Sequence, residues 1–284
     1  MLVAEFGINL IVLLNHNNYL VLLVFFNILE VNKTDIYMNG WSFCIVTIPE
    51  NEDLLFKCIE KIEYEFANMD NYEIIIVGNK VNHYKNCISL DFQEETFFFS
   101  FKHIKAAILN KSIKNIFKKS GAICKKKNLA AKYAKYDKLC VLHDYVGLES
   151  GWKDGWDNFK EEWEVAMNVI LNKDLTRHRD WLVWDYPGIG ACLLPYNYYC
   201  KYMYISGTYF CVKKDFFLKY PLNERLFWGE GEDVEWSLRI REITKFKVNS
   251  KSVVKYLKLK PSDDAPYCDS WVNNSKLLEE ILNK

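Results

Sequence analysis

The chain has 284 residues, half of them hydrophobic, and its 37 lysines and arginines balance its 37 aspartates and glutamates. A chain of this length can bury one substantial core, whereas a net charge of zero argues against nucleic acid as a partner and against binding to an anionic membrane surface. The nine cysteines are scattered, without a Cys-x-x-Cys pair or a nearby histidine, so we expect buried reduced thiols and neither disulfides nor zinc.

Residues 1–40 are predicted to be a hydrophobic amino-terminal extension. Its two apolar runs, Leu10–Leu14 and Tyr19–Leu29, are separated by four polar residues, which would be costly at the middle of a bilayer. No basic cluster precedes the runs and no clear cleavage site follows them, so a signal peptide fits poorly. Three interpretations stay open: a poorly structured or partly packed extension, a marginal membrane anchor, or a start codon placed too far upstream. We expect a cytoplasmic protein, with membrane association through this segment as the alternative.

A strand, a helix and a second strand open the main domain, which we expect to span residues 41–260. Ser42–Ile48 and Tyr72–Gly78 are continuous apolar runs typical of strands buried on both faces, and apolar residues recur at helical spacing from Leu54 to Phe66. This order predicts a right-handed crossover in a parallel sheet. Ligands of such sheets bind beyond the carboxyl ends of the strands. The candidates there are Thr47, Pro49, Glu50, Gly78 and Asn79. For Gly78 and Asn79, a purely structural turn is an equal alternative.

The middle of the chain is less regular. Short strands are predicted at Cys87–Asp91 and Thr96–Phe101, and helical spacing continues over Ile104–Phe117 with lysines on the outer face. A further helix is predicted at Lys125–Ala134, with Leu129, Ala130, Tyr133 and Ala134 facing inward.

The next apolar strand, Lys138–Leu142, ends in the polar pair His143-Asp144. A polar pair at the exit of a buried strand lies where a parallel sheet presents ligands, although it also suits a simple turn cap. Mg²⁺ and Mn²⁺ both prefer oxygen ligands, and Mn²⁺ accepts imidazole more readily.

Aromatic residues dominate the following stretch. The spacing from Trp156 to Ile170 predicts a helix, and its tryptophans, with Trp152, could pack in the core or stack on a sugar. Arg177 and Arg179 lie in a polar, aromatic loop and are weak acceptor-site candidates that could equally pair with surface acids.

Two glycines alternate with carboxylates in the segment Trp228–Glu235, and an amphipathic helix pattern starts directly after them. This arrangement places Glu232 and Asp233 in the first turn of a helix, where free N–H groups and the helix dipole favour ionised acids. Carboxylates in that position can hold a sugar hydroxyl and take its proton. The alternative is an acidic helix start with a capping role only.

The segment Trp228–Glu235 is similar to the tryptophan-glycine, glutamate-aspartate motif of inverting galactosyl- and N-acetylgalactosaminyltransferases and of related family 2 glycosyltransferases with a GT-A fold. Ser206-Gly207 resembles their small-residue turn before a strand. The resemblance implies an α/β, Rossmann-like fold with a mainly parallel central sheet flanked by helices and a carboxyl-terminal portion on the acceptor side. Residues 261–284 would form a tail with a short helix. This chain has one residue more before the acid pair than the commonest form, and Gly78-Asn79 stands where the family has acids.

The resemblance also implies roles for individual residues. The nucleotide-sugar donor would be bound by Thr47, Pro49, Glu50, Gly78, Asn79, Lys127, Asn128 and His143. Asp144 stands at the position of the family's metal-contacting acid, with His143 in place of the acid before it, so the two would hold Mn²⁺ or Mg²⁺. Glu232 would hold the acceptor hydroxyl while Asp233 takes its proton, and the acceptor would also contact Trp228, Gly229, Glu230 and Gly207.

The implied function is metal-assisted, inverting transfer of a hexose-type sugar from a nucleotide-sugar to a hydroxyl group of a glycan or polysaccharide. It requires the clusters around Asp144 and Asp233 to converge. Two alternatives stay open. A non-catalytic carbohydrate-binding relative would explain the missing acids at Gly78-Asn79 and His143, but not the presence of Glu232 and Asp233. A nucleotidyltransferase would need a glycine-rich, basic loop after the first strand, which residues 49–52 do not provide.

Overall fold

The computed structural model describes residues 13–14, 20–21, 38–79, 86–92, 122–187, 190–226 and 228–259. The chain divides into two units, Met1–Ile36 and Tyr37–Lys284. In the first unit, β1 (Leu13–Leu14) pairs with β2 (Leu20–Val21) in antiparallel fashion. The elements predicted at residues 96–101, 104–117 and 277–282 lie outside the described residues.

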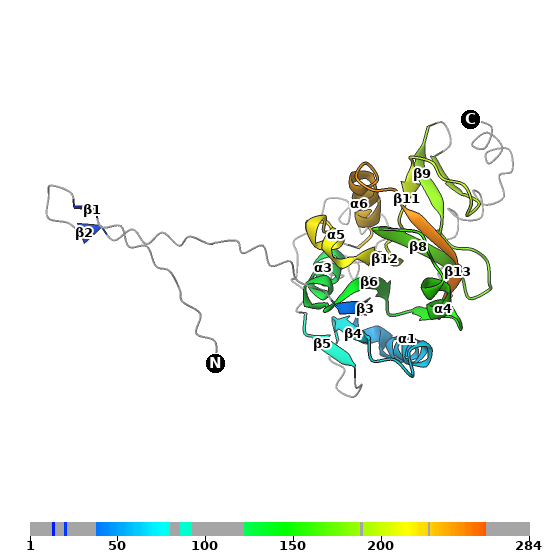
Figure 1. The fold of residues 1–284 in the computed structure, drawn as a ribbon, viewed down its shortest axis with the longest axis horizontal. Helices are drawn as coiled ribbons and strands as arrows, with labels where there is room; N and C mark the ends of the chain where they lie inside the picture. Colours follow the sequence, from blue (N-terminus) through cyan, green and yellow to red (C-terminus); the bar gives the residue numbers. More distant parts are fainter. Residues whose placement is uncertain are drawn as a thin grey trace, which may run out of the picture. The chain divides into compact units, whose positions relative to one another are not determined.

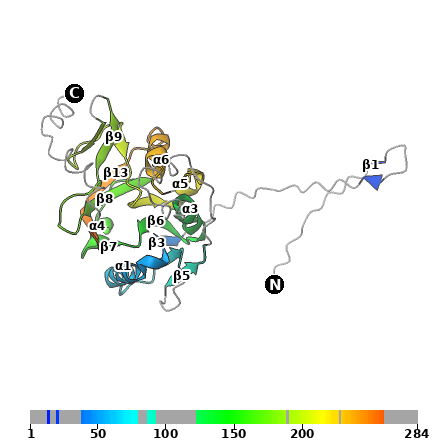
Figure 2. The same cartoon turned by 180° about the vertical axis from the view of Figure 1, so that it is seen from behind.

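An eight-stranded sheet organises the second unit (Figures 1 and 2). In spatial order its strands are β5 (Cys87–Leu90), β4 (Tyr72–Val77), β3 (Met38–Val46), β6 (Tyr136–His143), β12 (Tyr209–Lys213), β8 (Val165–Leu171), β13 (Lys247–Tyr256) and β7 (Val146–Leu148). Following the pairings across the sheet, β12 and β7 run opposite to the other six strands. The prediction of an α/β fold with a mainly parallel sheet is confirmed.

Helices cover both faces of this sheet (Figures 1 and 2). The helices α1 (Glu52–Glu65) and α4 (Trp152–Asp157) lie on one face, and α3 (Ile123–Tyr133) and α5 (Lys214–Lys219) lie on the other. On the first face, the ring of Phe43 lies 5.2 Å from Phe66 and 5.6 Å from Trp152. Because both faces are covered, the central strands β3 and β4 are buried along almost their whole length, which explains their continuous apolar runs.

The predicted first helix is confirmed as α1, whose buried side chains recur at helical spacing: Leu55, Cys58, Ile59 and Ile62. A short 3-10 helix, η1 (Pro49–Asn51), joins β3 to α1. Proline suits this start because its fixed φ favours a helical first turn and its missing N–H would have no partner there.

The helix predicted from Trp156 to Ile170 is wrong. The helix α4 ends at Asp157, and the second half of the segment is the strand β8, which pairs with β12 and β13. A short apolar run bordered by polar residues fits either element, and pairing on both sides decided for the strand. The tryptophans belong to the core, since Trp152 and Trp156 lie 4.9 and 5.3 Å from the ring of Trp41.

A smaller antiparallel sheet lies between β8 and β12 in the sequence. Its strands, in spatial order, are β10 (Gly190–Leu193), β9 (Leu182–Tyr186) and β11 (Met203–Tyr204). Leu182 and Tyr204 of this sheet form a separate apolar cluster that Val234 of α6 (Glu232–Ile240) joins. The small sheet thereby reaches the first turn of the helix that carries the acid pair.

The apolar runs at 246–249 and 252–257, which predict two closing strands, belong to one continuous strand, β13, with an irregular register between Asn249 and Val253. The eight cysteines within the described residues are free thiols. Among the described helices, none combines the length and apolar character needed to cross a bilayer.

Candidate active site

The first acid-bearing turn lies where β3 and β6 end side by side, since Val46 pairs with His143. Asp144 follows β6 and is only 2% exposed. Its Oδ2 accepts a hydrogen bond from Thr47 Oγ1 at 2.8 Å, and the Asn51 amide donates to both carboxylate oxygens at 3.1 Å. Burial raises the pKa of the Asp144 carboxyl, and the hydrogen bonds from Thr47 and Asn51 oppose this rise. Asp144 therefore ties the end of β6 to the turn that follows β3.

The groups around Asp144 do not fit the predicted Mn²⁺ or Mg²⁺ site. Both carboxylate oxygens already accept hydrogen bonds, and the ring of His143 packs edge-on against Tyr145 at 5.3 Å between centroids. Within the described residues, no three His, Cys, Asp or Glu side chains come together as metal ligands. Since Mg²⁺ and Mn²⁺ need several oxygen ligands, the structure does not support the predicted pair of Asp144 and His143 as a metal centre.

A second turn, residues 205–208, leads into β12. Tyr209 pairs with Leu142 of β6, and the His143 N–H donates to the Thr208 carbonyl oxygen at 3.1 Å. The predicted small-residue turn before a strand is therefore present. It lies directly beside the end of β6 from which Asp144 follows.

Asp233, in the first turn of α6, is held against this second turn. Its Oδ2 accepts hydrogen bonds from the Tyr204 hydroxyl and, at 2.9 Å, from the Gly207 N–H, while Oδ1 accepts from the Val234 N–H at 2.9 Å. A Cβ atom on Gly207 would lie 2.9 Å from both Cβ and Oδ2 of Asp233, so only glycine permits this approach. The carboxylate is thus fixed in one orientation by two different elements.

Lys127 and Glu232 form a buried pair beside Asp233. The Lys127 side chain is fully buried, and its Nζ donates to the Gly207 carbonyl oxygen at 2.6 Å and lies 3.9 Å from Glu232 Oε1. Burial raises the pKa of Glu232, the charge of Asp233 raises it further, and the ammonium of Lys127 opposes both effects. Glu232 therefore holds its proton more tightly than an exposed glutamate does.

The neighbouring Lys126 holds the turn that follows β3. It is also buried, and its Nζ donates to the Thr47 carbonyl oxygen at 3.1 Å. Two consecutive lysines of α3 thus bind the main chain of the turn that follows β3 and of the turn at residues 205–208. The inward face predicted for this helix is partly wrong, because Tyr133 is 56% exposed whereas Lys126 and Lys127 are buried. Ammonium groups that bind buried carbonyls satisfy backbone acceptors, and apolar spacing alone cannot reveal this.

The predicted donor residues differ in their surroundings. Pro49 and Glu50 are exposed in η1, and Asn79 is half-buried. Gly78 has φ +118°, and a Cβ atom there would lie 2.2 Å from the Thr47 carbonyl oxygen. A tight packing requirement is therefore enough to explain Gly78.

Asn128 is occupied by a structural contact. Its amide donates to the Leu222 carbonyl oxygen at 2.9 Å and to Glu224 at 3.0 Å, and its own oxygen accepts from the Leu222 N–H at 3.1 Å. This geometry favours a role in holding the loop before α6 over direct contact with a nucleotide.

Of the predicted acceptor residues, Trp228 is 62% exposed and belongs to the turn that leads into α6, together with Gly229 at φ +83° and the exposed Glu230. Gly231, at φ +76°, is the N-cap of α6. Trp228 thus presents an aromatic face to solvent close in sequence to Glu232 and Asp233.

The arginines considered from the sequence are engaged elsewhere. Arg177 pairs with Asp180 at 2.7 Å, and Arg239 pairs with Glu235 at 3.0 Å within α6. The contact of Arg177 agrees with the ion-pair alternative, although its partner Asp180 is buried and is not a surface acid. The sequence likewise allows an ion pair for Arg239, and the structure shows one.

The hydrogen bond from His143 to Thr208 joins the strand end that precedes Asp144 to the turn at residues 205–208, which binds Asp233. Three residues that complete the arrangement were missed: Asn51, Lys126 and Tyr204. Each makes its contact across a long sequence separation, so no local pattern marks it.

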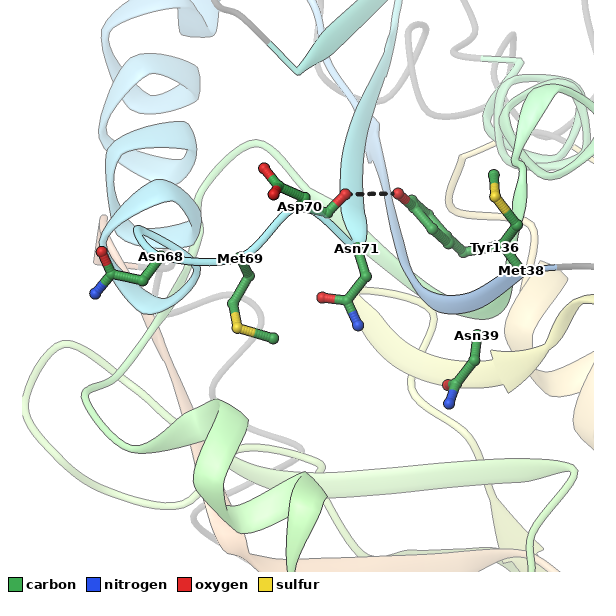
Figure 3. A pocket seen from close by; sticks show the side chains of 7 residues that line it. All are labelled: Met38, Asn39, Asn68, Met69, Asp70, Asn71 and Tyr136. Carbon is green, nitrogen blue, oxygen red and sulfur yellow. Dashed lines mark hydrogen bonds between the residues drawn. The ribbon is translucent and has the colours of Figure 1, made fainter.

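A hollow of about 430 Å³ lies at the opposite, amino-terminal ends of β3 and β6, lined by the residues that Figure 3 labels. Tyr136, which begins β6, lies there and donates to the Asp70 carbonyl oxygen at 2.9 Å. His143 ends the same eight-residue strand, and each residue of a strand advances it by about 3.3 Å. The hollow therefore lies about 23 Å from the strand end that precedes Asp144. The hollow is not part of the candidate site.

Comparison with known proteins gives structural likenesses only. No family model and no curated protein matches the chain. A structure of S. aureus TarS 1–349, also solved with UDP, is 12% identical with a TM-score of 0.48, over 80% of this chain and 62% of that one. GalNAc-T7 with UDP, GalNAc and Mn²⁺ is 15% identical with a TM-score of 0.49, over 78% of this chain and 44% of that one. The chain thus spans less than two thirds of each of these structures, and likenesses with TM-scores below 0.5 do not assign it to a family.

Proposed function

We propose that the chain is a GT-A-type glycosyltransferase that moves a sugar from a nucleotide-sugar donor to a hydroxyl group of a glycan or saccharide acceptor, with inversion at the anomeric carbon. The observation that carries this proposal is the fixed carboxylate of Asp233 at the carboxyl-end edge of a mainly parallel sheet. Ligands of such sheets bind at that edge, and an oriented carboxylate there can act as a general base.

Asp233 is the proposed base, and its two oxygens differ in their surroundings. Oδ2 accepts hydrogen bonds from Tyr204 and Gly207, whereas Oδ1 accepts one from the Val234 N–H and has a second lone pair that can receive a proton. Oδ1 takes the proton of the acceptor hydroxyl as its oxygen forms a bond to the anomeric carbon. The bond from that carbon to the diphosphate oxygen breaks on the opposite face, so the nucleoside diphosphate leaves and the configuration inverts in one step.

The proposed acceptor site combines Glu232 with the turn at Trp228. The exposed indole offers a flat apolar surface to a sugar ring, Gly229 and Glu230 follow it in the same turn, and Gly207 contacts Asp233. The raised pKa of Glu232 favours a carboxyl that exchanges hydrogen bonds with a hydroxyl group. Glu232 would hold the hydroxyl while Asp233 deprotonates it.

The donor is proposed to lie over the ends of β3, β4 and β6, beside Thr47, the Pro49–Glu50 turn, Gly78, Asn79 and His143. Lys127 contributes through its charge, because its buried ammonium group gives the region positive charge that favours a diphosphate. Asn128 contributes indirectly, since it holds the loop that precedes α6.

The test is release of nucleoside diphosphate from a panel of nucleotide-sugars, with and without saccharide acceptors. We expect release from at least one donor, and a loss of about 100-fold or more in kcat for Asp233→Asn. The matched control is Asp215→Asn, which removes an exposed acid from the first turn of α5 and should leave release unchanged. Saccharide binding without turnover of any donor would instead favour the non-catalytic carbohydrate-binding alternative.

A further inference from the structure

We infer that Asp144 is a positioning residue that clasps the turn between β3 and α1, and that it is not a ligand of a divalent metal ion. The importance of this turn for donor binding rests on the proposed function. The clasp itself rests on the contacts that Asp144 makes.

Hydrogen bonds from one turn engage both oxygens of the Asp144 carboxylate. Its Oδ2 accepts from Thr47 Oγ1 at 2.8 Å, and both oxygens share the amide of Asn51 at 3.1 Å. The Asp144 N–H also donates to the Val46 carbonyl oxygen at 3.2 Å. A metal-binding carboxylate has to direct lone pairs at an ion that other ligands share, whereas each oxygen of this one directs at least one lone pair at side chains of a single turn.

Asn51 gives an independent indication of the same role. It occupies the N-cap position of α1, where asparagine normally accepts a hydrogen bond from the first turn of the helix. Its side chain makes no such bond and donates its amide to Asp144 instead. Asn51 therefore binds Asp144 in place of the N–H groups that it could cap in α1.

Lys126 holds the same turn from the main-chain side, through the Thr47 carbonyl oxygen at 3.1 Å. Thr47 is thus fixed by its hydroxyl, which binds Asp144, and by its carbonyl, which binds Lys126. Such a doubly held turn is prearranged for a ligand at the end of β3. The ammonium groups of Lys126 and Lys127 supply positive charge at the two turns without a metal ion.

The experiment combines direct Mn²⁺ titration, followed by the electron paramagnetic resonance signal of the free ion, with thermal unfolding. The titration uses the full chain, alone and with each of a panel of nucleoside diphosphates. Asp144→Ala, Asp144→Asn, Thr47→Val and Asn51→Ala are compared with the wild type. We expect equal Mn²⁺ uptake by the wild type and Asp144→Asn under every condition.

Thermal unfolding measures how much the hydrogen bonds among Asp144, Thr47 and Asn51 stabilise the fold. Asp144→Ala, Thr47→Val and Asn51→Ala should each lower Tm. Asp144→Asn should recover most of the loss, because its amide oxygen still accepts a hydrogen bond. Where a nucleoside diphosphate binds, Asp144→Asn should also recover most of the affinity that Asp144→Ala loses.

Stoichiometric Mn²⁺ uptake that Asp144→Asn abolishes, with Tm unchanged, would overturn the inference. Failure of every nucleoside diphosphate to bind the wild type would count against the proposed glycosyltransferase. The Mn²⁺ and Tm measurements would still decide the role of Asp144 in that case.

Discussion

Replacement of Lys127 by methionine tests the charge interactions of the candidate site most sharply. Methionine keeps the length and apolar stem of the side chain but removes a fully buried ammonium group. Two interactions are lost: the 2.6 Å hydrogen bond to the Gly207 carbonyl oxygen and the attraction to Glu232 Oε1 at 3.9 Å. The first holds the turn that binds Asp233, and the second stabilises the charge of Glu232.

The magnitude follows from these two parts. A hydrogen bond from a charged donor contributes about 1.5–3 kcal/mol, and breaking a buried ion pair costs about 3–5 kcal/mol. Glu232 can compensate for the loss of its partner by taking up a proton, which limits the total loss in free energy of unfolding. We therefore expect Lys127→Met to lower the free energy of unfolding by about 3–5 kcal/mol at pH 8, and by about 1.5–3 kcal/mol at pH 5.

The pH dependence has a defined sign. Burial raises the folded-state pKa of Glu232 above its ordinary value of 4.5, and loss of Lys127 raises it further. The folded protein then binds the proton more tightly than the unfolded chain, so the free energy of unfolding falls as pH rises from about 4.5 through the folded-state pKa. This fall should be steeper in Lys127→Met than in the wild type.

The assay is urea denaturation at pH 5 and pH 8. Lys132→Met, an exposed position on the same helix, is the control and should change stability by less than about 0.5 kcal/mol. Adding Glu232→Gln to Lys127→Met should remove the extra pH dependence. An equal cost at both pH values, or a cost below about 0.5 kcal/mol, would refute this account of the pair.

Three further substitutions examine the neighbouring contacts. Tyr204→Phe removes a hydrogen bond to Asp233, and we expect about a 10-fold or greater loss in kcat with little change in the KM for the acceptor; the reverse pattern would contradict a role in orienting Asp233. Gly207→Ala places a methyl group 2.9 Å from Asp233 and should lower the free energy of unfolding by about 1–3 kcal/mol, measured by urea denaturation; unchanged stability and activity would show that the turn is not closely packed. Trp228→Ala should leave stability within about 0.5 kcal/mol, because the side chain is 62% exposed, but should raise the KM for the saccharide acceptor; an unchanged KM would remove Trp228 from the site.

Buried strands and amphipathic helices were the most predictable parts of the fold. The runs that became β3, β4 and β6 are apolar because helices cover both faces of the sheet, and α1 shows its buried face directly in its spacing. The segment around β8 was misread because its strand is identified only by its pairing with β12 and β13, which lie far away in the sequence.

The candidate site was predictable where its chemistry is local. The acids of α6 and the pair after β6 could be found because each stands at the boundary of a recognisable element. The contacts that orient them could not, since Tyr204, Lys127 and Asn51 reach their partners through the fold. The metal role of Asp144 was implied by the resemblance to the GT-A family at the end of this strand, and its hydrogen bonds to Thr47 and Asn51 argue against that role.

The central claim is that Asp233 deprotonates an acceptor hydroxyl for a single inverting displacement. The most direct measurement is the anomeric configuration of the first-formed product, determined by nuclear magnetic resonance, together with its rate of formation by the wild type and Asp233→Asn. The account predicts a product with configuration opposite to that of the donor, formed by the wild type and at least about 100-fold more slowly by the variant. A product of retained configuration, or an unimpaired Asp233→Asn enzyme, would contradict it.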